Sequence, residues 1–128
     1  MNAQTHLTAI TIGRILLGVY FLLPGIMKIV EWDRHIALMQ HHDISYTAPL
    51  LLIATGANIL LGVLLMANQQ VRLAAYGCVA YIVVINFTLH DFWNFEGMEG
   101  AHELQNFVKN LGILAGLLVL AGYSPNRR

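Results

Sequence analysis

Four long apolar runs constrain this chain more than any other feature of its sequence. They cover residues 7–29, 47–66, 71–89 and 107–123, and as helices they are long enough to cross the roughly 30 Å hydrocarbon core of a bilayer. Backbone groups in lipid must find hydrogen bonds within their own segment, so each run is expected to be helical. We therefore predict an all-α fold, with residues 1–128 forming one membrane domain, a bundle of four transmembrane helices.

The composition agrees with a membrane protein. Hydrophobic residues make up 57% of the chain and charged residues 11%, against about 45–50% and 25% in soluble proteins. Because these few polar side chains cannot cover the outside of a soluble bundle, a lipid bilayer is the expected partner. The formal net charge is zero, and nucleic-acid binding needs a clustered basic face, so no nucleic-acid partner is expected.

Four crossings place both termini on one side of the membrane, together with the short turn at residues 67–70. The basic residues are divided four to three between the two sides, with Arg14, Arg72, Arg127 and Arg128 on the terminal side and Lys28, Arg34 and Lys109 on the other. By the positive-inside rule, this bias predicts that both termini are cytoplasmic. All seven carboxylates and five of the six histidines fall on the opposite side, which is where polar chemistry is expected.

Arg14, Gly18, Phe21, Gly25 and Lys28 recur at spacings of three and four residues, so they form one stripe of the first helix. This stripe is expected to face protein, because a central lipid-facing arginine costs about 3 kcal/mol. Arg14 has two interpretations, a side chain that reaches the headgroups and one that meets a bound anion. Lys28 is either an interfacial anchor or part of a site.

The segment TLHDFWNFEG, residues 88–97, brings His90 and Asp91 to the end of the third run. Its aromatic residues are typical of a membrane interface. Adjacent helical residues point about 100° apart, so His90 and Asp91 are each expected to have a partner elsewhere. Lys109 and Asn110, which open the last run, are the predicted neighbours. Two interpretations stay open here: a clamp onto the last helix, or a polar pocket for an anion, a proton or a quinone head group.

The tandem His41-His42 and the group of His102 with Glu99 and Glu103 could each suggest Zn²⁺ or Cu²⁺ binding. Their spacing is not diagnostic, and solvated loop or interfacial histidines are the favoured interpretation, so no metal site is predicted. Since Cys78 is the only cysteine, a monomer has no disulfide and no C-x-x-C redox pair.

Small and amide residues inside the runs indicate close helix packing. Gly112 and Gly116 have the small-xxx-small spacing, and the glycine faces favour a homodimer. The intramembrane asparagines are expected to form interhelical hydrogen bonds. Arg14 and Arg72, each near the start of a run and followed by a glycine, suggest a parallel internal repeat.

These motifs together resemble the DoxX family of small four-helix bacterial membrane proteins. The resemblance is carried by the first-run stripe from Arg14 to Lys28, by HDFWN at residues 90–94 and by FVKNLGILAGLL from residue 107. It implies a multi-pass protein of the bacterial inner membrane. Some relatives are described as a subunit of a thiosulfate:quinone oxidoreductase and others are linked to oxidative-stress complexes. The matching polar positions, which are the candidate substrate- or quinone-binding residues, are Arg14, Lys28, His90, Asp91, Lys109 and Asn110.

The leading functional hypothesis is a subunit or accessory protein of a quinone-linked redox system, with a polar pocket on the periplasmic side. It requires a redox partner protein or a bound cofactor, because the sequence has no haem-attachment motif, flavin fingerprint or cysteine pair. The resemblance assigns no catalytic residue and does not imply that the chain is itself an enzyme. A non-enzymatic membrane scaffold and, less favoured, a small-solute carrier are the alternatives.

Overall fold

A computed structural model describes the backbone of residues 3–124 and the side chains of residues 7–124. Arg127 and Arg128, which enter the charge comparison above, lie outside the described residues. The elements are α1 (Ala3–Val30), α2 (Trp32–His41), α3 (Thr47–Met66), α4 (Val71–Thr88), the 3₁₀ turn η1 (Phe92–Asn94) and α5 (Gly97–Tyr123). No strand occurs within residues 3–124, so the predicted all-α class is confirmed.

Four helices are long and apolar enough to span a membrane, which confirms the predicted bundle. Two boundaries differ from the expectation. The last helix begins at Gly97, ten residues before the predicted start at 107, and the first long loop contains the short helix α2. Asp33 in the first turn of α2 and His41 in its last turn suit the helix dipole. Both extra segments are amphipathic or polar and therefore lack the hydropathy used to find a span.

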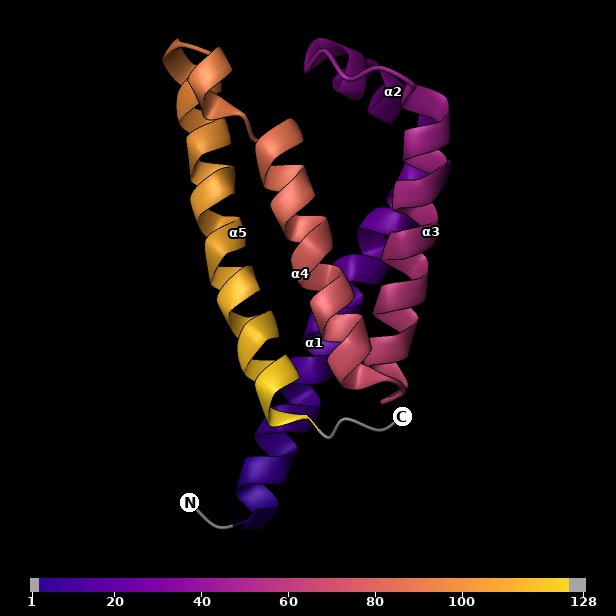
Figure 1. Cartoon of the computed structure of the whole chain (residues 1–128), viewed down its shortest axis with the longest axis vertical. Coiled ribbons are helices and arrows are strands. Elements are labelled where there is room, and N and C mark those ends of the chain that lie inside the picture. The colour runs from indigo at the N-terminus through magenta and orange to yellow at the C-terminus, as the bar shows by residue number, and fades with distance from the viewer. Residues whose placement is uncertain (1–2, 125–128) are drawn as a thin grey trace.

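The helices form two hairpins, α1–α3 and α4–α5 (Figure 1). The start of α1, the end of α5 and the turn between α3 and α4 lie at one end of the bundle, as four crossings require, whereas α2 and η1 lie at the other (Figure 1). We call these the turn end and the loop end. The cytoplasmic location of the turn end stays a prediction from the charge bias.

The first hairpin depends on glycines in the stripe of α1 and on the facing side of α3. A Cβ atom added at Gly62 would lie 2.7 Å from the carbonyl oxygen of Gly18 and 2.7 Å from the backbone nitrogen of Leu22. At Gly25, an added Cβ would lie 2.9 Å from Cβ of Asn58. The two backbones therefore approach so closely that no larger residue fits, which confirms the expectation that the stripe faces protein.

Each hairpin is capped by an arginine of its own first helix. Arg14 on α1 donates through Nη1 to the carbonyl oxygens of Leu65 and Met66 at the end of α3, the second at 3.0 Å. Arg72 on α4 donates through Nε to the carbonyl oxygen of Ala121 near the end of α5, at 3.1 Å. Both arginines satisfy carbonyls that a helix end leaves without a partner. The same contact in both hairpins is what a parallel repeat would produce.

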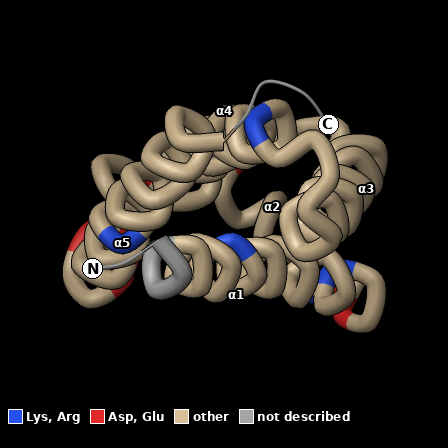
Figure 2. The backbone as a smooth tube through the Cα atoms, turned by 90° about the horizontal axis from the view of Figure 1, so that it is seen from below, with Lys and Arg blue, Asp and Glu red and all other residues tan. Residues whose placement is uncertain are grey.

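The two hairpins pack together near the turn end and separate towards the loop end (Figure 1). Their shared apolar core is built from small and medium side chains of α3, α4 and α5, including Leu65, Ala75, Cys78, Leu117 and Ala121. All five are fully buried. Viewed from the turn end, the four long helices carry few charged residues along their length (Figure 2). The outer surface thus suits contact with lipid.

The close contact of α1 with α3 predicts a sharp difference between two glycine substitutions. Gly62→Ala forces a methyl group against backbone atoms and is expected to lower the stability by about 1–3 kcal/mol. Gly112→Ala is the matched control, because nothing lies within 4 Å of the Cβ it would add, so it is expected to be neutral or slightly stabilising. Thermal unfolding in detergent measures both, and equal melting temperatures would contradict the packing described.

Candidate functional site

Four titratable side chains meet at the loop end and join the two hairpins. Nδ1 of His42, which follows α2, donates to Oδ1 of Asp91 in the loop after α4, at 2.6 Å. Nε2 of His42 lies 3.3 Å from Oε2 of Glu103 on α5. Nδ1 of His90 lies 2.9 Å from Oε1 of the same Glu103. We call these four residues the histidine–carboxylate cluster.

The local backbone brings His42 to this position. Helix α2 ends at His41, and the chain turns through Asp43, which has a positive φ of 58°. The amide of Ile44 donates back to the carbonyl of Met39 at 3.0 Å, which closes the turn. Phe95 packs against the rings of both His41 and His42, with the ring centroids 5.3 and 5.0 Å apart. The turn thereby points His42 inward, away from solvent.

Asp91 and Glu103 are positioned by the second hairpin. Asp91 immediately precedes η1, and Asn94 donates through Nδ2 to its Oδ2 at 2.7 Å. The first turn of α5 packs so closely on η1 that a Cβ atom at Gly100 would lie 2.6 Å from the carbonyl oxygen of Phe95. This contact sets the register of α5, and Glu103 follows one turn later.

The electrostatics of the cluster centre on His42, whose side chain is 1% exposed. Both ring nitrogens face carboxylates, although the contact of Nε2 with Glu103 lacks hydrogen-bond geometry. A protonated imidazole has two N–H donors and can serve both carboxylates, whereas the neutral ring has one. No lysine or arginine within residues 7–124 pairs with Asp91 or Glu103. Within these residues, the basic side chains that contact the two carboxylates are therefore the histidines.

A second pair lies beside the cluster on the surface. Nε2 of His41 is 2.6 Å from Oε2 of Glu99, and the two side chains are 54% and 49% exposed. Solvent screens such a pair, so it contributes little to stability. It has the same chemistry as the buried contacts and differs from them in burial.

Deeper in the bundle, amides and phenols link the helices. Asn110 on α5 donates to Oδ1 of Asn86 on α4 at 3.0 Å and accepts from the hydroxyl of Tyr20 on α1 at 3.1 Å. The hydroxyl of Tyr81 on α4 donates to Oδ1 of Asn58 on α3 at 2.7 Å. These bonds confirm the expected interhelical role of the three asparagines. They satisfy polar groups that would be costly in lipid.

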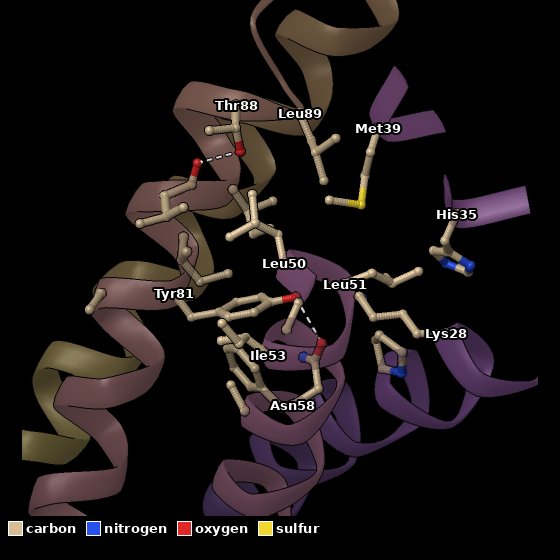
Figure 3. Close-up of a pocket in the computed structure, with 18 of the residues that line it drawn as sticks. Lys28, His35, Met39, Leu50, Leu51, Ile53, Asn58, Tyr81, Thr88 and Leu89 are labelled. Carbon is tan, nitrogen blue, oxygen red and sulfur yellow. Dashed lines mark hydrogen bonds between the residues drawn. The ribbon is translucent and has the colours of Figure 1, made fainter. Parts of the chain in front are cut away.

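The space between the hairpins is a cavity of about 610 Å³, which we call the hairpin cavity. Its lining is mainly aliphatic, with residues such as Leu50, Leu51 and Ile85. Figure 3 shows Lys28 of α1 and His35 of α2 on one side of it, and the Tyr81–Asn58 hydrogen bond at its wall. The few polar side chains in the lining are Tyr20, Lys28, His35, Asn58, Tyr81, Thr88, His90 and Asn110.

A second groove of about 590 Å³ lies between α1 and α5. Arg14 and Lys109 line it, together with Gly13, Gly112 and Gly116. Nothing lies within 4 Å of a Cβ added at any of these three glycines. The small-xxx-small pair of α5 thus opens on this groove and does not pack against another helix of the chain.

The structure separates the six predicted site residues into three places. Lys28, His90 and Asn110 line the hairpin cavity, and Arg14 and Lys109 line the groove between α1 and α5. Asp91 is buried in the histidine–carboxylate cluster. Lys109 therefore does not lie beside His90, because α5 begins ten residues earlier than expected and Glu103 takes that place.

The expectation that His90 and Asp91 have separate partners is confirmed, and the bond from His90 to Glu103 is the predicted clamp onto the last helix. Two residues of the cluster were not predicted. His42 was expected as a solvated loop or interfacial histidine, and the structure contradicts the solvated location because the turn after α2 buries its side chain. The tandem histidine next to an amphipathic segment was the available signal for His42. For Glu103, the sequence offered no signal beyond its place in the acidic group with Glu99 and His102.

The cluster is built from pairs, and within residues 7–124 no three His, Cys, Asp or Glu side chains are arranged to hold a metal ion.

Four apolar helices in two hairpins, with their titratable groups gathered at one end, define an integral multi-pass membrane protein. The DoxX family model matches residues 9–91.

The chain therefore belongs to the DoxX family. The match covers α1 to α4 and ends at Asp91, so α5, which supplies Glu103, lies beyond it. No curated protein and no solved structure matches the chain.

Burial predicts that the two neighbouring histidines respond differently to truncation. His42→Ala leaves two buried carboxylates without their shared partner and is expected to destabilise the protein by about 3–5 kcal/mol. His41→Ala removes an exposed pair and is expected to cost at most about 1 kcal/mol. Unfolding in mixed micelles with increasing denaturing detergent gives both values. Similar losses for the two variants would show that the cluster does not join the hairpins.

Proposed function

We propose that this DoxX protein is a subunit of, or accessory to, a quinone-linked redox system, and that a quinone occupies the hairpin cavity. The observation that carries this proposal is the cavity itself, about 610 Å³ of mainly aliphatic space with a few polar groups along it. Small-molecule sites have about 300–1,000 Å³ and this kind of lining. An isoprenoid quinone combines a long apolar tail with a ring that carries two carbonyl acceptors.

The polar residues of the cavity suit the ring. Lys28 and His35 lie on the side formed by α1 and α2 (Figure 3), and His90, which follows α4, also lines the cavity. Nδ1 of His35 is bonded to the carbonyl oxygen of Glu31 at 2.8 Å, which leaves Nε2 as its second polar atom. Ammonium and imidazole N–H groups donate to carbonyl oxygens and stabilise the negative charge that develops on them during reduction.

The electrons must come from elsewhere. Cys78 is the only thiol and is fully buried in the apolar core. With no haem-attachment motif or flavin fingerprint in the sequence, the redox partner is a second protein or a cofactor bound to one. The loop end, where His41, Glu99 and other polar residues are exposed, is the surface proposed for that partner. By the charge bias it faces the periplasm of a bacterial inner membrane.

A membrane scaffold is the second candidate, and one observation favours it. Gly112 and Gly116 have open space around them and lie in a groove that no helix within residues 3–124 fills. Glycine pairs of this spacing allow close approach of another transmembrane helix, including that of a second copy. A scaffold does not require the hairpin cavity, so the two candidates separate when the cavity is filled.

Filling the cavity tests the proposed function. Ala57→Trp places a large ring into the cavity lining and is expected to weaken binding of a decyl-benzoquinone at least tenfold, because the space for the ligand is lost. Leu60→Trp is the matched control, since Leu60 lies on the same helix, is 59% exposed and does not line the cavity. Binding to the purified protein in nanodiscs is followed by fluorescence quenching. Wild-type protein that binds no quinone, or binding unaffected by Ala57→Trp, would overturn the proposal.

A further inference from the structure

The histidine–carboxylate cluster has an order that joining two hairpins does not require. Along the contacts, acid and base alternate from Asp91 to His42 to Glu103 to His90, at 2.6, 3.3 and 2.9 Å. The single buried pair of His42 with Asp91 already joins the two hairpins. Four alternating groups within or near hydrogen-bond distance are what a proton needs to move by successive transfers.

The two ends of the chain of contacts lie in different surroundings. Asp91 is next to the polar loop end, and its side chain retains 7% exposure. His90, at the other end, lines the hairpin cavity and is 22% exposed. Nδ1 of His90 is bonded to Glu103, so Nε2 is the ring atom available to a ligand. The contacts therefore lead from Asp91, which is buried beneath the loop-end surface, to His90 in the lining of the cavity.

The longest contact, between His42 and Glu103, is not a completed hydrogen bond. Nε2 of His42 is buried and has no hydrogen-bond partner, although Oε2 of Glu103 is 3.3 Å away. A buried N–H without an acceptor costs free energy, so a small rotation of either side chain that completes this bond is favoured. Such a rotation joins the two halves of the chain of contacts.

We propose that Asp91, His42, Glu103 and His90 form a proton relay between the loop-end surface and the hairpin cavity. A proton from the surface first adds to Asp91. In the tautomer of His42 that carries its hydrogen on Nε2, Asp91 passes this proton to Nδ1 and Nε2 passes its own proton to Oε2 of Glu103. Rotation of the Glu103 carboxyl group presents the proton to Nδ1 of His90, and Nε2 of His90 releases one into the cavity. A turn of each imidazole ring restores its starting tautomer before the next proton. One proton enters for each that leaves, so the total charge of the four groups is unchanged.

The inference rests on the proposed function for the identity of the final acceptor. Reduction of a benzoquinone to the hydroquinone consumes two electrons and two protons, and forms an O–H bond at each carbonyl oxygen. In the relay, His90 delivers these protons and the surface replaces them through Asp91. The electrons come from the redox partner, or from dithionite in the experiment below.

The first experiment separates proton delivery from binding. Decyl-benzoquinone bound to the full chain in nanodiscs is reduced rapidly with dithionite, and proton uptake is followed with a pH-sensitive dye. Glu103→Gln and His42→Gln are expected to slow uptake at least tenfold while the quinone affinity stays within about twofold. Glu99→Gln and His41→Gln, the matched changes in the exposed pair, are expected to have the wild-type rate. Equal rates in all four variants would overturn the relay.

The second experiment needs no quinone, so it decides the relay even if the proposed function fails. In ¹⁵N-histidine spectra of the ligand-free protein, the exchange of the His90 ring proton with water is measured. His42→Gln is expected to slow this exchange at least tenfold, although the ion pairs of His42 are with Asp91 and Glu103 and not with His90, and a purely structural role would not change it. His41→Gln is the control. Unchanged exchange in His42→Gln, in a variant whose melting shows that it is folded, would overturn the relay.

Discussion

The interaction on which the architecture depends is the burial of His42 between two carboxylates. The hairpins share an apolar core near the turn end only, where Leu65, Ala75 and Leu117 are fully buried. At the loop end, apolar packing is replaced by the contacts of His42 with Asp91 and Glu103. Charged groups out of water are stable only when paired, so this junction fixes the hairpins in one relative position.

Fixing the hairpins at both ends explains the space between them. Two hairpins held at one end only could close along their length and bury their facing apolar surfaces. With the loop end held apart by α2 and the turn after it, the hairpin cavity of about 610 Å³ stays open. His90 belongs both to the histidine–carboxylate cluster and to the lining of the cavity. Structure and proposed chemistry thus share one set of side chains.

The sequence was sufficient for the parts of the structure that depend on hydropathy and local geometry. Length and apolar character predicted the four spans, and the periodicity from Arg14 to Lys28 predicted the face of α1 that packs on α3. The rule that adjacent helical residues point apart correctly predicted that His90 and Asp91 have different partners. The partner of each could not be predicted, because α2 and the first ten residues of α5 have no spanning hydropathy, and these segments carry His42 and Glu103.

The most direct test of the account is the distance between the hairpins at the loop end. Spin labels at Gln40 and Ala101, both exposed, report this distance by pulsed electron paramagnetic resonance once Cys78 is replaced by alanine. The account predicts one narrow distribution that becomes broad when His42 is changed to alanine, and stays narrow when His41 is changed instead. The same distribution in all three proteins would contradict the claim that His42 holds the cavity open.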